Sequence, residues 1–212
     1  MKLSGPVLAA ALAAIVFFVV DQLGIVGGLP RIVLKGSAVA ILAASAAANA
    51  RSRDGWLLAG VMAAGALGDM FIELSIMLGA AAFAVGHAIA IWLYLANRRP
   101  APMPMSQKAA AAALLLTAPL LWLLAGKAGD AGVALYVALL TLMAATAWTS
   151  RFSRYRTGVG ALMFLVSDAL ILADLGGKVD PGLAALAIWP LYAAGQILIF
   201  VGVRTRLAVA PR

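Results

Sequence analysis

The chain has 212 residues, of which 65% are hydrophobic and 11% are charged. This composition excludes a soluble globular domain and predicts an integral membrane protein. The net charge of +8 does not indicate a nucleic-acid partner, because the basic residues lie in short clusters between apolar runs and form no basic face.

The apolar runs predict an all-α bundle of eight transmembrane helices. A spanning helix needs about 20 mainly apolar residues. In chain order such runs lie roughly at residues 5–23, 32–50, 55–72, 76–96, 107–125, 131–149, 158–175 and 183–203. The links between them are short, so we expect residues 1–212 to form one domain in which sequence neighbours pack antiparallel. The first run has a basic start like a signal peptide, but no small-x-small cleavage motif follows Val20, so we expect it to be retained.

The positions of lysine and arginine predict that both termini are cytoplasmic. With eight spans, the links alternate between the two sides of the membrane. The side of the termini then carries twelve basic residues, whereas the other side carries only Arg31, Lys35, Lys127 and Lys178. Because cytoplasmic links are enriched in lysine and arginine, the side with twelve is cytoplasmic. We expect the membrane to be the inner membrane of a bacterium.

Two aspartates lie inside predicted spans. Asp69 is in the run at 55–72 and Asp168 in the run at 158–175. An aspartate near the centre of a spanning helix costs about 2.5 to 3.5 kcal/mol on insertion scales, so such residues usually face the bundle interior and mark a proton, ion or substrate site. The alternative is that each carboxyl only hydrogen-bonds between helices.

The surroundings of these aspartates suggest a weak internal repeat. Gly68-Asp69 and Ser167-Asp168 each place a small residue before the acid, in the third helix of each four-helix half, 1–100 and 107–206. In each half the next helix carries a polar residue near mid-span, His87 in one and Gln196 in the other. Both aspartate-bearing helices run in the same direction, so any repeat would be parallel rather than inverted.

Other polar residues form a set of candidates around the acids. Tyr192 and Gln196 are four residues apart, so their side chains share one face of a helix. Lys35 lies near the outer mouth of its helix, where its amine can extend to the interface or meet a carboxylate or a lipid phosphate. Glu73 is expected at the outer rim. His87, Tyr192 and Gln196 are equally compatible with interhelical packing.

Four motifs bring these residues into a recognisable order. They read GD at 68, GAAAFAVGH at 79–87, GALMFLVSD at 160–168 and YAAGQ at 192–196. The ordered set resembles the YhhN-like family of membrane lysoplasmalogenases. The chain departs from that pattern at Gly36, where the family often has proline after the lysine, and at Ala90, where it often has an aromatic residue. Neither departure touches the two acids, although both bear on substrate preference.

The resemblance implies an enzyme that hydrolyses the vinyl ether bond of lysoplasmalogens. Its substrates would be the lysophospholipids lysoplasmenylcholine and lysoplasmenylethanolamine, taken from the lipid bilayer, and its products a fatty aldehyde and a glycerophospho-alcohol. Asp69 and Asp168 would share acid–base catalysis, with one protonated and the other ionised. No metal or cofactor is implied, and the sequence does not indicate an oligomeric state. The supporting or substrate-binding residues would be His87, Tyr192, Gln196, Lys35 and Ser167.

Three other classes of function fit part of this pattern. A proton-coupled transporter would use the same acids and His87 at mid-membrane, although it would favour inverted repeats. A zinc-dependent membrane hydrolase generally needs several histidines, and this chain has one histidine and no cysteine. A structural membrane protein would use the polar residues only to join helices.

Overall fold

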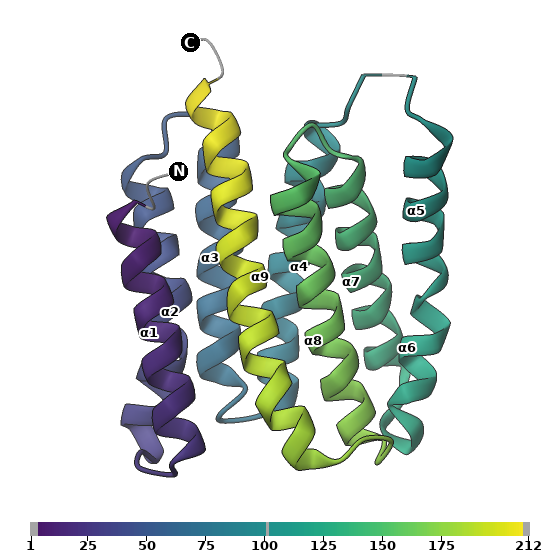
Figure 1. The fold of residues 1–212 in the computed structure, drawn as a ribbon. Coiled ribbons are helices and arrows are strands. Elements are labelled where there is room, and N and C mark those ends of the chain that lie inside the picture. The colour runs from purple at the N-terminus through teal and green to yellow at the C-terminus, as the bar shows by residue number, and fades with distance from the viewer. Residues whose placement is uncertain (1–3, 101, 210–212) are drawn as a thin grey trace.

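The computed structural model describes residues 4–100 and 102–209, and within them the chain is all-α (Figure 1). A 3₁₀ turn covers Gly126–Ala128 and a π-helical turn covers Arg154–Gly158. The α-helices are α1 (Gly5–Gln22), α2 (Gly28–Ala48), α3 (Arg53–Phe71), α4 (Ile76–Ala96), α5 (Met105–Leu116), α6 (Ala118–Leu124), α7 (Ala131–Thr149), α8 (Val159–Leu175) and α9 (Pro181–Val209). Each predicted span coincides with one of these helices, or with α5 and α6 together.

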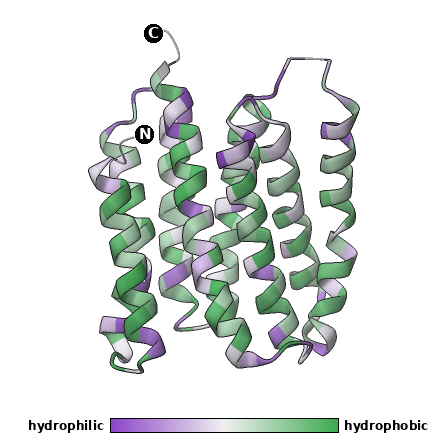
Figure 2. Cartoon of the chain, in the orientation of Figure 1, coloured by the Kyte–Doolittle hydropathy of each residue, from purple (hydrophilic) through white to green (hydrophobic). Residues whose placement is uncertain are grey.

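Length and hydropathy identify most of these helices as membrane spans. Among the described residues, seven helical segments are long and apolar enough to cross a membrane, with α5 and α6 counted as one. Hydrophobic residues cover most of their length (Figure 2). The chain is therefore a multi-pass membrane protein. Helix α3 has 19 residues and is long enough to span, but Arg53, Asp54 and Asp69 make it more polar.

The fifth predicted span differs from the prediction in being broken. A continuous helix was expected over 107–125, whereas α5 ends at Leu116 and α6 begins at Ala118. The reason is Pro119, which has no N–H to continue the hydrogen-bond ladder. Thr117, at the break, donates its hydroxyl to the carbonyl of Leu114 at 2.6 Å.

The helices pack in an order that only partly follows the chain. Helices α1 to α4 each pack on the next, but α4 then packs on α7, while α5 and α6 lie outside α7. Helices α8 and α9 form a close pair, and α9 also contacts α1, α2 and α3. The indole N–H of Trp189 on α9 donates a hydrogen bond to the backbone carbonyl of Ala14 on α1, at 2.9 Å. The expectation that sequence neighbours pack together is thus wrong for α4 and α5, because α7 occupies that side of α4.

Both ends of the described chain lie toward the same end of the bundle (Figure 1). Helices α3 and α8 both run away from that end, so their aspartates lie toward the opposite end. Which end faces the cytoplasm stays a prediction, and so does the four-plus-four repeat.

Candidate active site

Asp69 belongs to a buried chain of three polar side chains. The carboxyl is 2% exposed and accepts a hydrogen bond at Oδ2 from the hydroxyl of Tyr192, at 2.9 Å. Gln196 donates from Nε2 to that same hydroxyl oxygen at 3.2 Å. The four-residue spacing on α9 therefore does place the two side chains on one face, and that face meets α3. Gly65 makes room for them, since a Cβ there would lie 2.8 Å from Gln196 Nε2.

Asp168 has a tyrosine partner that sequence reasoning missed. Its carboxyl is 5% exposed, and Tyr136 of α7 donates a hydrogen bond to Oδ2 at 2.5 Å. No motif contains Tyr136, and the sequence gives it no spacing relation to Asp168. The only available signal was that a tyrosine interrupts an apolar run. Each aspartate is thus held by one tyrosine hydroxyl from a neighbouring helix.

An aromatic cluster lies between the two acid–tyrosine pairs. The ring of Phe164 is 5.2 Å from that of Tyr192 and 5.0 Å from that of His87, both edge to face. His87 in turn lies 5.5 Å from Tyr136. Phe83 completes the cluster against Phe164 at 5.8 Å. Through Phe164 and His87, the ring contacts therefore run from Tyr192, the partner of Asp69, to Tyr136, the partner of Asp168.

The second glycine of importance in α3 is Gly68, which precedes Asp69. A Cβ on Gly68 would lie 2.7 Å from the ring of Phe83. The absence of a side chain lets Phe83 of α4 pack directly against the backbone of α3 beside the acid. The Gly-Asp motif therefore combines a close helix contact with a buried carboxyl.

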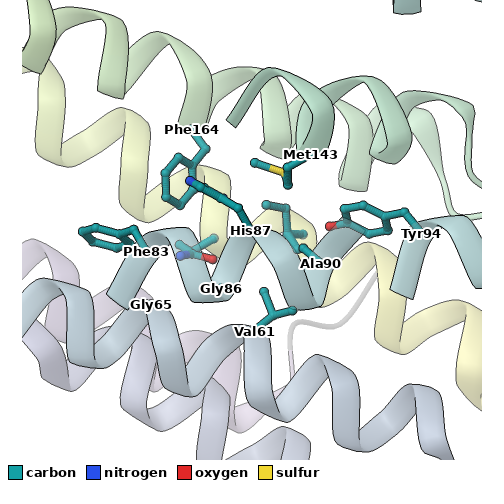
Figure 3. Close-up of a pocket in the computed structure, with 11 residues that line it drawn as sticks. Val61, Gly65, Phe83, Gly86, His87, Ala90, Tyr94, Met143 and Phe164 are labelled. Carbon is teal, nitrogen blue, oxygen red and sulfur yellow. The ribbon is translucent and has the colours of Figure 1, made fainter. Parts of the chain in front are cut away.

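A small cavity adjoins this cluster (Figure 3). About 20 Å³ of it is open to the centre of a water molecule, and one water needs about 10 to 15 Å³ by this measure. Neither carboxyl lines it. Two buried polar atoms of lining residues, His87 Nε2 and Gln196 Oε1, have no hydrogen-bond partner among the described residues. The lining residues are Val61, Gly65, Phe83, Gly86, His87, Ala90, Tyr94, Met143, Phe164, Gln196 and Ile199.

Lys35 lies in an ionic cluster at the end of the bundle opposite the termini. Its amine is 2.6 Å from Oε1 of Glu73, which also pairs with Arg31. Arg31 makes a further ion pair with Asp21 at 2.7 Å. Lys35 is therefore engaged with a carboxylate instead of extending alone to the interface, and it is within range of the charge of Asp69. We call Asp21, Arg31, Lys35 and Glu73 the ionic cluster.

Ser167 precedes Asp168 in sequence, but its hydroxyl makes a hydrogen bond outside the two acid–tyrosine pairs. It donates to the carbonyl of Ile188 on α9 at 3.0 Å and does not bond either acid. Ser167 is 1% exposed, so this bond joins α8 to α9 within the core. The structure thus gathers His87, Tyr192 and Gln196 around the acids and directs the hydroxyl of Ser167 elsewhere.

Among the residues that the structure describes, no group of three or more histidine, cysteine, aspartate or glutamate side chains is placed to hold a metal ion.

The fold and the site together define a multi-pass α-helical membrane protein with two buried, tyrosine-bound carboxyls. Residues 30–203 match the YhhN family, so the chain belongs to the YhhN family and the resemblance of its motifs is confirmed. Over 180 residues it is 31% identical to proteins named lysoplasmalogenase from Mycobacterium bovis and Mycobacterium tuberculosis. Each alignment covers 79% of this chain and 68% of the relative. No solved structure matches the chain.

Proposed function

We propose that the protein is a lysoplasmalogenase, which hydrolyses the vinyl ether bond of lysoplasmenylcholine or lysoplasmenylethanolamine. The products are a fatty aldehyde and a glycerophospho-alcohol. The observation that carries the proposal is the pair of buried carboxyls, Asp69 and Asp168, each bound by a tyrosine hydroxyl. Support comes from the two mycobacterial relatives, whose names state this activity.

The chemistry explains why such an enzyme needs two acids. Hydrolysis of a vinyl ether begins when an acid protonates the β-carbon, which leaves an oxocarbenium ion. Water adds to that ion, and the resulting hemiacetal collapses to the aldehyde and the alcohol. One carboxyl supplies the proton, and a second carboxylate stabilises the cation and guides the water, as paired carboxyls do at a glycosidic bond.

His87 and Gln196 are suited to bind the attacking water. Both are buried and both line the cavity, and each has a buried polar atom with no hydrogen-bond partner among the described residues. Gln196 also connects this cavity to Asp69 through the hydroxyl of Tyr192. A water bound between them would be fixed by polar groups in a mainly apolar wall.

The ionic cluster is suited to the lipid headgroup. Lys35 and Arg31 carry the positive charges that a phosphate needs, and both are partly exposed at the end of the bundle toward which the acids lie. Because Glu73 binds both cations, a phosphate would have to exchange with it. The alkenyl chain would then extend from the headgroup into the membrane interior.

The test is release of a fatty aldehyde from a lysoplasmalogen by the purified protein, followed by mass spectrometry. We expect Asp69→Asn and Asp168→Asn each to lower turnover by about 10²- to 10⁴-fold, the usual contribution of acid–base catalysis. Asp174→Asn, also on α8 but outside the two acid–tyrosine pairs, is the matched control. Near-normal turnover by both variants would remove these residues from the mechanism. Solute-dependent proton flux without a covalent product would instead favour a transporter.

A further inference from the structure

From its place between His87 and Asp168, we infer that Tyr136 is a positioning residue that makes Asp168 the proton donor. This inference rests on the proposed function and deepens it. The hydroxyl of Tyr136 binds Oδ2 of Asp168 at 2.5 Å, across the contact between α7 and α8. With Oδ2 held, Oδ1 is the oxygen that can carry the proton to the substrate.

The ring of Tyr136 is itself held in place. It packs at 5.5 Å and 60° against the imidazole of His87, which lies edge to face against Phe164 at 5.0 Å. The hydroxyl is therefore presented to Asp168 by a side chain with little freedom to turn. An acid that must reach one carbon of a substrate benefits from such preorganisation, because the correct orientation is fixed before reaction.

The two acids lie in unlike surroundings, and this assigns their roles. Asp69 lies four residues before Glu73, whose carboxylate binds Lys35 at 2.6 Å, and the tyrosine that binds Asp69 is also bound by Gln196. Among the residues that the structure describes, Tyr136 alone donates a side-chain hydrogen bond to Asp168. A carboxylate near a cation is suited to stabilise the developing oxocarbenium ion throughout the reaction. Both acids accept a bond from a neutral hydroxyl, but Asp168 is on α8, away from the ionic cluster, and is therefore suited to become charged only when it gives up its proton.

The proton-transfer step balances with these groups. Asp168 Oδ1–H gives its proton to the β-carbon, and the electrons of the C=C bond form the new C–H bond. This leaves an oxocarbenium ion and an Asp168 carboxylate. The hydrogen bond from Tyr136 then ends on an anion and strengthens, which stabilises the product of the step more than its reactant. When water adds to the cation, the proton it releases returns to Asp168.

The experiment compares Tyr136→Phe with the wild-type protein. Phenylalanine keeps the ring against His87 and removes only the hydroxyl. We expect kcat for aldehyde release to fall by about 10- to 100-fold, the range for losing one hydrogen bond to a charged group. We expect KM to stay within about twofold, because the hydroxyl contacts Asp168 and not the substrate. Tyr155→Phe, a change at an 82% exposed tyrosine, is the control and should be unchanged.

Two readouts separate positioning from simple helix packing. In a double-mutant cycle, Tyr136→Phe should add no further loss to Asp168→Asn, because its effect passes through that carboxyl. Infrared spectra should show a carboxyl C=O band that disappears in Asp168→Asn and moves to higher frequency in Tyr136→Phe.

Failure of the inference and failure of the proposed function give different results. Three results would each overturn the inference and leave the enzyme a lysoplasmalogenase. They are a normal kcat in Tyr136→Phe, additive losses in the double-mutant cycle, and a carboxyl band whose frequency is the same in Tyr136→Phe as in the wild type. A wild-type protein that releases no aldehyde would overturn the proposed function. The infrared comparison would then still decide whether Tyr136 binds a protonated Asp168.

Discussion

At the scale of single residues, the site depends on hydrogen bonds that cross between helices. Asp69 and Asp168 are each placed by a residue far away in sequence, Tyr192 and Tyr136 respectively. Buried carboxyls are costly unless they are hydrogen-bonded, so these bonds are a condition for having the acids in the membrane at all. They also fix the direction of each carboxyl, which is what a reaction at one carbon atom requires.

Gly65→Ala tests whether the position of Gln196 matters. The new Cβ would lie 2.8 Å from Nε2 of Gln196 and 3.5 Å from the hydroxyl of Tyr192, so the amide must move away from that hydroxyl. We expect about a tenfold loss of aldehyde release. The matched control is Gly60→Ala on the same helix, where the nearest atom to the new Cβ is 3.5 Å away, on Ile89. Equal activity of the two variants would contradict a role for Gln196.

Arg31→Gln tests the proposed headgroup contact. The change removes a positive charge from the ionic cluster, far from the reacting bond. We expect KM for a lysoplasmalogen to rise by about tenfold with kcat unchanged, because a contact equally strong in ground and transition states affects only binding. Lys127→Gln, an exposed cation near the same end of the bundle, serves as the control. A fall in kcat at unchanged KM would place Arg31 in another role.

At the scale of elements, the two acid–tyrosine pairs are assembled by four helices with different tasks. Helices α3 and α8 carry the acids, and α9 and α7 bring the tyrosines that bind them. The close approach of α8 and α9 depends on glycine: a Cβ on Gly160 would lie 2.6 Å from the carbonyl of Gly195, and one on Gly195 would lie 2.8 Å from that of Gly160. Small residues permit such contacts between membrane helices.

Gly195→Ala should therefore destabilise the α8–α9 pair. A methyl group at a backbone contact forces the helices apart, and overpacking of this kind typically costs about 1 to 3 kcal/mol. The measurement is the midpoint of thermal unfolding in detergent. Gly5→Ala, where no atom lies within 4 Å of the new Cβ, is the control and should not lower the midpoint. If the unfolding midpoint of Gly195→Ala equals that of Gly5→Ala, the close contact between α8 and α9 does not contribute to stability.

The helices show most clearly what could be predicted from the sequence and what could not. Span positions were predictable because lipid demands long apolar helices with satisfied backbones. The packing partner of α4 could not be predicted, because no local feature of the sequence shows that α7 and not α5 packs against it. The break at Thr117 had a visible cause in Pro119, but a proline in a membrane helix can also be accommodated, as Pro190 is within α9.

At the scale of the whole molecule, the orientation in the membrane is open to a direct test. The chain contains no cysteine, so a single introduced thiol can be labelled without background. Ser153 and Lys178 are exposed near opposite ends of the bundle. We expect a membrane-impermeant maleimide to label Lys178→Cys in intact cells and Ser153→Cys only after the membrane is opened, because lysine and arginine gather at the end that holds Ser153. The reverse pattern would invert the predicted topology.

Composition and long apolar runs by themselves determined that this chain is a multi-pass α-helical membrane protein, and four motifs pointed to its family and to two intramembrane acids. That much is local, because hydropathy, helix length and motif spacing are properties of adjacent residues. Only the tertiary structure decided which groups meet: Tyr136 with Asp168, Lys35 with Glu73, and Ser167 with a backbone carbonyl instead of an acid. Such pairings depend on how helices rotate and pack against one another, and no single helix carries that information in its sequence.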